Sequence, residues 1–159
     1  MTARAYLMQA RELYKSLSVL SQEIERRRTI AEKTVGQLQH DRIQTSKTGK
    51  EGEDNLIEIA TMSTELSHKQ KTLNDLMTEI SLNITSYSYK HCDVLYDYYI
   101  RRMTLDEIAQ KYSKSRQWSW SERNAGETDI MKAMIKYPSD FSEVALPNND
   151  KTRQEWTTS

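Results

Sequence analysis

An arginine and a glutamine, Arg116 and Gln117, follow directly after a serine that can start a helix. Ser115 is a favoured N-cap residue, so the sequence predicts a helix that begins at Arg116. Arginine can donate a pair of hydrogen bonds to O6 and N7 of guanine, and glutamine can form a similar pair with N6 and N7 of adenine. These side chains in the first turn of a helix are therefore typical of a surface that contacts base edges.

A shorter helix is expected immediately before this one. Thr104 and Glu107 have the spacing of a capping box, in which each side chain bonds to the backbone N–H of the other residue. Apolar residues then follow at helical spacing, at Leu105, Ile108, Ala109 and Tyr112. A capped helix, a tight turn and a second, polar helix together predict a DNA-binding helix-turn-helix.

The formal net charge of the chain is zero, so charge alone does not mark the whole protein as a nucleic-acid binder. The balance is different within residues 111–124. The cations there are Lys111, Lys114, Arg116 and Arg123, against one acid, Glu122. A local basic patch of this kind is suited to contact with phosphate groups.

The composition favours long helices with a small compact unit over one large core. Only 36% of the residues are hydrophobic, and the chain has four glycines and two prolines. The hydrophobic fraction is below the roughly 45–50% of typical globular chains. Few glycines and prolines are present to interrupt helices. We therefore expect an all-α fold.

Two apolar seams predict an antiparallel, coiled-coil-like helical hairpin over residues 1–86. The first helix is expected over about residues 5–38, with a seam of Leu13, Leu17, Leu20, Ile24, Ala31, Val35 and Leu38. The second seam consists of Leu56, Ile59, Leu66, Leu73, Met77, Ile80 and Ile84. Polar residues and two of the four glycines predict a loop between the helices over about residues 39–55.

The predicted hairpin has a small core of its own, so we expect it to pack against another surface. One interpretation is an arm that forms a dimer or docks on RNA polymerase. Polar residues in the second seam, Ser63 and Gln70, could then set the register and the choice of partner. The other interpretation is a hairpin that pairs within one chain and serves as a spacer. The seams themselves are compatible with both.

After Ile84 the heptads give way to serine and tyrosine, which places a domain boundary near residue 86. Residues 87–137 are expected to form the helix-turn-helix domain, with an apolar support helix before the motif and a closing helix after it. These two helices carry Cys92, Val94, Leu95, Tyr98 and Tyr99, and Ile130, Met131, Met134 and Ile135, respectively. Residues 138–159 contain both prolines and no sustained periodicity, which is typical of a flexible tail.

Residues 94–112 resemble region 4 of bacterial sigma factors, in which an apolar helix precedes a capped helix, a turn and a Ser-capped recognition helix. The stretch Met103-Thr104-Leu105-Asp106-Glu107-Ile108-Ala109 carries most of this resemblance. More narrowly, the chain is similar to the RinA/ArpU-like late-gene activators of Gram-positive phages, which also pair an N-terminal coiled segment with such an end. The resemblance covers residues 92–124 and extends more loosely over residues 5–85.

The resemblance implies a transcriptional activator of phage late or packaging genes, acting in the cytoplasm of a bacterial host. Its partners would be double-stranded DNA, RNA polymerase and a second copy bound through the coiled arms. The recognition helix would lie in the major groove and present Arg116, Gln117, Trp120 and Ser121 to the bases. Lys114 and Arg123 would contact phosphates, which position the protein without specifying a sequence.

Three residues depart from the family pattern. Ser119 stands where Val or Ile is usual, Lys114 where an apolar residue is usual, and Gly126 where a core Ala or Leu is expected. A glycine within a helix costs roughly 1 kcal/mol relative to alanine. Two phasings of the recognition helix follow. In the first, the helix keeps the register of the family, with positions 119 and 126 in the core. In the second, the helix is rotated by about one residue, so that Trp118 and Ala125 lie in the core.

The chemistry expected of an enzyme or a metalloprotein is absent from the sequence. The three histidines show no metal-ligand spacing with one another or with Cys92, and no phosphate-cradling glycine loop or GxSxG motif occurs. We therefore expect no catalysis, no cofactor and no metal. The single cysteine is typical of a reducing cytosol. No apolar stretch is long enough to span a membrane, and the N-terminus lacks the apolar run of a signal peptide.

Two other functions fit parts of the same sequence. The first is an adaptor that binds a repressor or an RNA polymerase subunit without reading DNA, since an exposed tryptophan is a common interface anchor. The second is a DNA-packaging factor similar to a terminase small subunit. Such proteins usually carry the helix-turn-helix before the oligomerisation helices, which is the reverse of the order here.

Overall fold

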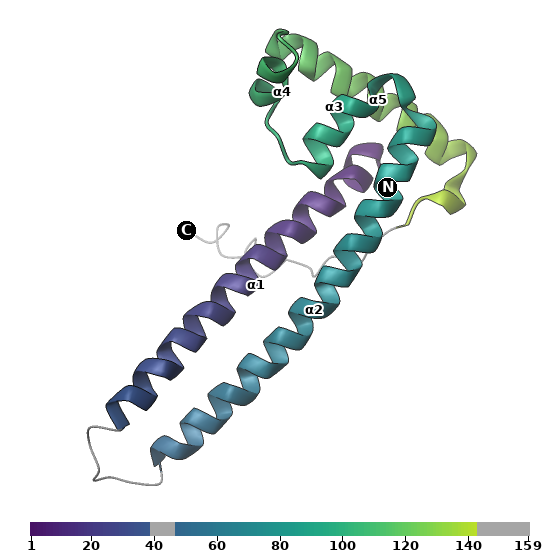
Figure 1. The fold of residues 1–159 in the computed structure, drawn as a ribbon. Coiled ribbons are helices and arrows are strands. Elements are labelled where there is room, and N and C mark those ends of the chain that lie inside the picture. The colour runs from purple at the N-terminus through teal and green to yellow at the C-terminus, as the bar shows by residue number, and fades with distance from the viewer. Residues whose placement is uncertain (39–46, 143–159) are drawn as a thin grey trace, which may run out of the picture. The chain divides into compact units, whose positions relative to one another are not determined.

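A computed structural model describes residues 1–38 and 47–142, and this part of the chain contains helices and no strand. The expectation of an all-α fold is therefore confirmed. The α-helices are α1 (Ala3–Leu38), α2 (Lys47–Tyr87), α3 (Cys92–Leu95), α4 (Leu105–Lys111) and α5 (Arg116–Lys136), shown in Figure 1. Short turns of other helical types lie at Tyr89–His91, Tyr96–Ile100 and Pro138–Asp140.

The chain separates into two compact units, and α1 and α2 contribute to both. The first unit combines Met1–Arg11 with the chain from Thr78 onward, and the second unit is Glu12–Met77. The boundary predicted near residue 86 is thus about nine residues too late, and the first eleven residues belong with the C-terminal helices. The reason is that Tyr6, Leu7 and Ile80 are buried in the first unit, with exposed fractions of zero.

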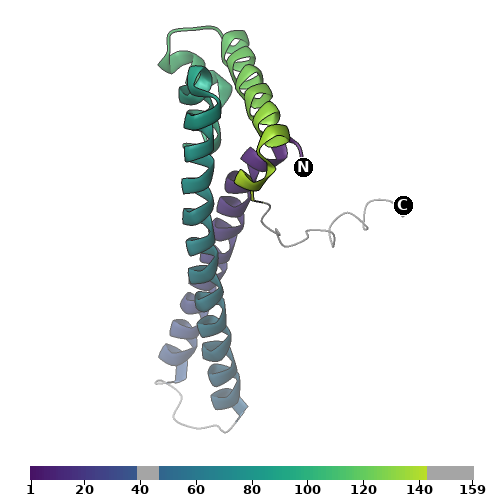
Figure 2. The same cartoon turned by 90° about the vertical axis from the view of Figure 1, so that its right-hand side faces the viewer.

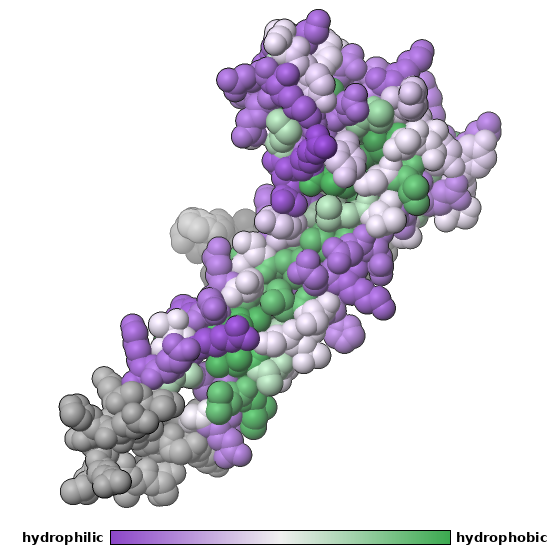
Figure 3. All heavy atoms as spheres, viewed as in Figure 1, coloured by the Kyte–Doolittle hydropathy of each residue, from purple (hydrophilic) through white to green (hydrophobic). Residues whose placement is uncertain are grey.

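In the second unit, α1 and α2 lie side by side and run antiparallel (Figure 2). An ion pair joins Arg27 to Glu58, and Lys69 Nζ donates to Ser16 Oγ over 3.5 Å. Apolar side chains gather along the two segments, as the green atoms in Figure 3 show. The buried ones are Leu13, Leu17, Ile24, Ile59, Leu73 and Leu76. Leu56, predicted to lie in the seam, is instead 62% exposed.

The predicted loop over residues 39–55 is wrong for its second half, because α2 begins at Lys47. Residues 39–46 lie outside the described part of the chain. Gly52 is helical and exposed, and the space around its Cα holds no side chain. Each glycine costs a helix only about 1 kcal/mol relative to alanine, and a helix of 41 residues tolerates that cost.

The core of the first unit gathers large side chains from all five helices or the turns between them. Those with almost no exposure include Tyr6, Leu7, Ile80, Ile84, Leu95, Tyr99, Ile108 and Ile130. Three polar side chains at the edge of this core, those of Tyr6, Glu79 and Asn83, are linked by hydrogen bonds. Asn83 Nδ2 donates to the hydroxyl of Tyr6 at 2.7 Å, and that hydroxyl donates to Glu79 Oε1 at 2.9 Å. Burial of the phenol raises the pKa of Tyr6, and its hydrogen bond to Glu79 raises this pKa further.

The first five residues of the predicted flexible tail are packed against the first unit. Phe141 is only 9% exposed, and its ring meets the ring of Tyr6 edge-on with centroids 5.1 Å apart. The backbone N–H of Ser142 donates to Glu79 Oε1 at 2.9 Å. The tail prediction is therefore wrong for residues 138–142, because a buried aromatic ring anchors them. Residues 143–159 lie outside the described part of the chain.

None of the described helices has an apolar stretch long enough to cross a lipid bilayer.

Candidate nucleic-acid interface

The helix α4 begins with the predicted capping box. Thr104 Oγ1 accepts from the N–H of Glu107 at 3.2 Å, and the N–H of Thr104 donates to Glu107 Oε2 at 2.6 Å. The bond from the Thr104 backbone, together with the Thr104 hydroxyl, lowers the pKa of Glu107. The box fixes the first turn of α4, so this prediction is confirmed.

A four-residue connection after Lys111 closes α4 and sets the start of α5. Ser113 has a positive φ of 54°, and the N–H of Lys114 donates to the carbonyl of Ala109 at 2.8 Å. The N–H of Ser113 donates to Gln110 O at 3.2 Å, which completes a Schellman motif. Ser115 then caps α5, because its Oγ accepts from the N–H of Trp118 at 3.1 Å. The second predicted N-cap is thus also confirmed.

A buried carboxylate behind the two helices holds the end of α4 in place. Asp97 is 1% exposed and lies in the π-helical turn Tyr96–Ile100. Its oxygens accept from Arg101 Nη1 at 2.7 Å, Lys111 Nζ at 2.6 Å and Tyr112 OH at 2.8 Å. Burial opposes the charge of Asp97, but the bonds from Lys111, Tyr112 and Arg101 outweigh it and lower the pKa. Sequence reasoning missed this group. Its one signal was an acid among the apolar and aromatic residues of 94–100.

The N-terminal turns of α5 present the four residues that were expected to face bases. Arg116, Gln117, Trp120 and Ser121 are all exposed, and the indole-bearing residue Trp120 has an exposed fraction of 46%. Leu105, from the first turn of α4, joins three of them to line a groove. The residues of this groove are Leu105, Arg116, Gln117 and Trp120. Side chains suited to base contact are therefore contiguous on the surface.

Arg116 is the cation of this groove and is only loosely held. Its Nε lies 3.6 Å from Asp106 Oδ1, and the two side chains are 69% and 68% exposed. An ion pair between side chains this exposed contributes between zero and about 1 kcal/mol. The guanidinium of Arg116 can therefore exchange Asp106 for another acceptor at little cost.

Of the two phasings considered for α5, the structure has the one that places positions 119 and 126 on the inner face. Ser119 and Ile130 have no exposure, and Gly126 is buried between them along the same face. Trp118 is half-buried, with its ring 5.7 Å from that of Tyr112. The alternative phasing, with Trp118 and Ala125 as core residues, is not adopted.

Leu95 explains why Gly126 stands at a core position of α5. A Cβ atom built on Gly126 would lie 2.7 Å from Leu95 Cδ1, which is far inside van der Waals contact. The Leu95 side chain is completely buried, so it occupies the space that an alanine or leucine at position 126 would need. The side chain of Leu95 therefore explains why position 126 is a glycine, where an alanine or leucine was expected.

Arg123 does not lie where the resemblance implied. Its side chain is only 10% exposed, with Nε 3.2 Å from Glu127 Oε1. Its guanidinium lies over the ring of Tyr98, 5.0 Å from the centroid, and Nη2 donates to Asn124 Oδ1 at 3.2 Å. The prediction of a phosphate contact is wrong for Arg123, because it shares the inner face of α5 with Ser119 and Gly126.

The outward-facing basic patch is consequently smaller than the sequence predicted. Arg123 is buried, and Lys111 is committed to Asp97. Lys114 and Arg116 are exposed at the turn and at the first residue of α5. Of the four cations counted in this stretch, these two are the ones positioned to meet phosphates or bases.

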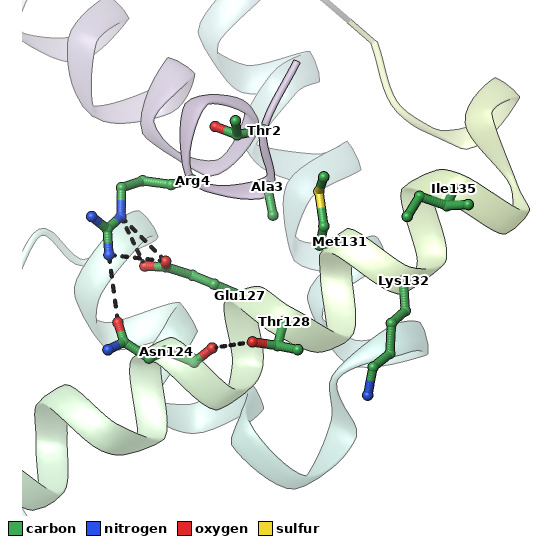
Figure 4. Close-up of a pocket in the computed structure, with 9 residues that line it drawn as sticks. All are labelled: Thr2, Ala3, Arg4, Asn124, Glu127, Thr128, Met131, Lys132 and Ile135. Carbon is green, nitrogen blue, oxygen red and sulfur yellow. Dashed lines mark hydrogen bonds and ion pairs between the residues drawn. The ribbon is translucent and has the colours of Figure 1, made fainter.

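A second polar cluster, absent from the sequence predictions, joins the start of α1 to α5 within the first unit. Glu127 is 13% exposed and accepts from Tyr99 OH at 2.5 Å and from Arg4 Nε at 3.2 Å. Arg4 Nη2 also donates to Asn124 Oδ1 at 3.4 Å, as Figure 4 shows. Burial and the bond to Glu127 raise the pKa of Tyr99. This cluster holds the middle of α5, at Asn124 and Glu127, rather than its N-terminal turns.

Within residues 1–38 and 47–142, no group of three or more His, Cys, Asp or Glu side chains could hold a metal ion. His91 is instead flanked by two carboxylates, with Nδ1 2.6 Å from Glu122 Oε2 and Nε2 4.0 Å from Asp129 Oδ2. Comparison of the chain with family models, with curated proteins and with solved structures finds no match.

Proposed function

We propose that the protein is a non-enzymatic, DNA-binding transcriptional regulator. In this proposal α4, the turn and α5 form a helix-turn-helix similar to sigma region 4, and the first turns of α5 enter the major groove. The observation that carries the proposal is the exposed, contiguous set Arg116, Gln117 and Trp120 beside Leu105. Two of these side chains have the hydrogen-bonding groups that distinguish guanine and adenine in the major groove.

The rigidity of the support favours recognition over a merely solvated polar face. Two N-caps, a Schellman turn and the buried carboxylate of Asp97 fix both helices of the motif. A surface that must match the edges of particular base pairs needs side chains held within a narrow range of positions.

The small basic patch implies that the unit binds weakly alone. Lys114 and Arg116 supply few phosphate contacts, and phosphate contacts provide most of the affinity for DNA. One helix-turn-helix also makes few base contacts, so specific binding usually needs a dimer or a second protein. We therefore include a dimer formed through the second unit, or RNA polymerase, as the further partner.

The second unit has features that such an association would use. Three of its large apolar side chains are more than half exposed, namely Val19 at 67%, Leu56 at 62% and Ile57 at 59%. Burial of these side chains against a partner would be favourable, at about 25 cal/mol per Å² of apolar surface. The assignment to late or packaging genes of a phage in a bacterial cytoplasm is carried by the resemblance of residues 92–124.

Capture of genomic fragments tests the proposal directly. The purified full-length protein would be mixed with sheared phage DNA at low and moderate salt, and the retained fragments sequenced. We expect enrichment of one site near a late operon, and loss of that enrichment in Arg116→Ala/Gln117→Ala. The matched control is Lys132→Ala/Lys136→Ala, which removes two exposed cations from the far end of α5. Uniform retention by both variants would contradict site-specific readout.

A second candidate function is a protein adaptor, which the exposure of Trp120 favours. Exposed tryptophans are frequent anchors of protein interfaces, and Trp120 is 46% exposed next to the apolar Leu105. An adaptor would retain no DNA even at low salt. It would form a stoichiometric complex with a repressor or polymerase subunit that Trp120→Ala weakens.

A further inference from the structure

The groove at the start of α5 combines two kinds of surface. Arg116 and Gln117 are polar and have hydrogen-bonding groups for purine edges, whereas Leu105 and Trp120 are apolar. The apolar half comes from two helices, since Leu105 is the first residue of α4 and Trp120 lies on α5. A surface that faces bases and has both polar and apolar side chains can recognise apolar groups of a base as well as its hydrogen-bond donors and acceptors.

Thymine is the one standard base with an apolar methyl group on its major-groove edge. Guanine, adenine and cytosine present acceptors or donors there, whereas thymine also presents a 5-methyl group. The Trp120 ring has one polar atom, its N–H, and is otherwise apolar. Leu105 has no polar side-chain atom, is half-buried and lines the same groove as Trp120.

The spacing along α5 places this apolar contact near the purine contact. Arg116 and Trp120 are four residues apart and so lie on one face of the helix. Four residues advance a helix by about 6 Å, which corresponds to roughly two base-pair steps of about 3.4 Å. A single docked helix can thus place Arg116 and Trp120 on neighbouring parts of one site.

We propose that Leu105 and Trp120 form a contact for the 5-methyl group of a thymine, within about two base pairs of the purine read by Arg116 or Gln117. This inference rests on the proposed DNA-binding function and deepens it by naming a base that the site selects. It assigns Trp120 a role in sequence specificity rather than in binding a protein.

The replacement of thymine by uracil tests the methyl contact without any change to the protein. The full-length protein would first select its site from random duplexes. Each thymine of that site would then be replaced singly by uracil, which lacks the methyl group and retains the same hydrogen-bonding groups. Burial of one methyl group corresponds to about fourfold in affinity. We expect a loss of about that size at one position and none at the others.

Protein variants assign the effect to Trp120. Trp120→Phe removes the indole N–H and keeps an apolar ring, so we expect the preference for thymine over uracil to persist. Trp120→Gln and Leu105→Ala should reduce that preference toward equality. Ile135→Gln is the matched control, because Ile135 is an apolar residue of the same helix with an exposed fraction of 75%. It should leave the preference unchanged.

The outcomes separate this inference from the function on which it rests. Equal affinity for thymine and uracil at every position, with selective binding retained, overturns the methyl contact and leaves the regulator in place. A preference that survives in Trp120→Gln also overturns it. An absence of any selected site, both for the protein alone and with RNA polymerase added, overturns both proposals together. Because the uracil experiment uses the unaltered protein, a variant that fails to fold does not prevent a decision.

Discussion

The ammonium group of Lys111 lies 2.6 Å from Oδ2 of Asp97, and this ion pair ties the last turn of α4 to the π-helical turn behind it. Asp97 is 1% exposed, while the Lys111 side chain is 37% exposed. The carboxylate is thus the buried partner, and the three groups that bond to it are Arg101, directly after the turn, and Lys111 and Tyr112, at the end of α4. Removal of Asp97 should affect the fold more than removal of any one donor.

We expect Asp97→Ala to lower the free energy of unfolding by about 2–4 kcal/mol. Loss of one partner of a buried ion pair costs about 3–5 kcal/mol when the other charge stays buried, and here the lysine can turn toward solvent. Lys111→Ala should cost less, because Arg101 and Tyr112 still satisfy the carboxylate. Urea unfolding followed by circular dichroism measures both. Equal effects of the two variants would contradict a role of Asp97 as the shared acceptor.

The same group predicts how stability changes with pH. The pKa of Asp97 is lower in the folded protein than the usual value of about 3.9. Its charge therefore stabilises the fold above that value, and the contribution is lost as the pH falls through the folded-state pKa. We expect the difference in stability between the wild type and Asp97→Asn to be constant from pH 5 to 7 and to shrink below about pH 4. A difference that grows on acidification would contradict the assignment.

Gly126→Ala should destabilise the protein although alanine is the better helix former. The added Cβ would lie 2.7 Å from Leu95 Cδ1, in a core where Leu95 has no exposure. Overpacking typically costs about 1–3 kcal/mol, against a gain of about 1 kcal/mol in helix propensity. We expect a net loss of up to about 2 kcal/mol by thermal or urea unfolding. Gly52→Ala is the matched control and should stabilise the protein, since its Cβ would meet open space.

A smaller residue at position 95 should reverse the effect of Gly126→Ala. In the background Leu95→Ala the clash is absent, so the added methyl group should be neutral or stabilising. A double-mutant cycle measures this coupling, which we expect at about 1–3 kcal/mol. Additive effects of the two substitutions would show that Leu95 is not the residue that requires glycine at position 126.

Ser113→Gly should raise the stability of the protein. Ser113 has a φ of 54°, a left-handed conformation that costs a residue with a side chain roughly 1 kcal/mol more than glycine. Its position after α4 is the one at which glycine is most frequent in a Schellman motif. We expect a gain of about 0.5–1 kcal/mol in urea unfolding. Ser121→Gly, within α5 and exposed, is the matched control and should instead cost about 0.5 kcal/mol.

Local signals in the sequence predicted the framework of the candidate site. The caps at Thr104 and Ser115 depend on contacts within three residues, so the spacing of the residue types was sufficient to find them. The exposure of Arg116 and Gln117 follows from their place at the start of a capped helix. These features need no knowledge of which other segment of the chain lies nearby.

The errors concern contacts between segments far apart in the sequence. The pairing of Leu95 with Gly126 and that of Arg4 with Glu127 span 31 and 123 residues. Nothing in the local pattern indicates either contact. Arg123 is buried because its guanidinium lies over the ring of Tyr98 and its Nε lies beside Glu127. Charge counts along the sequence treat such an arginine as exposed, and for this reason they overestimated the basic patch.

The different environments of Arg116 and Arg123 give a paired test of the proposed interface. Arg116 is 69% exposed, whereas Arg123 is 10% exposed and lies against Tyr98 and Glu127. Arg116→Ala should weaken binding to the selected DNA site by about 1–3 kcal/mol, the value of a bidentate contact with guanine, and leave the melting temperature unchanged. Arg123→Ala should lower the melting temperature, because it removes a buried partner of Glu127. Fluorescence anisotropy and thermal unfolding of the same two variants distinguish these roles, and a large loss of stability in Arg116→Ala would contradict the assignment of its side chain to the surface.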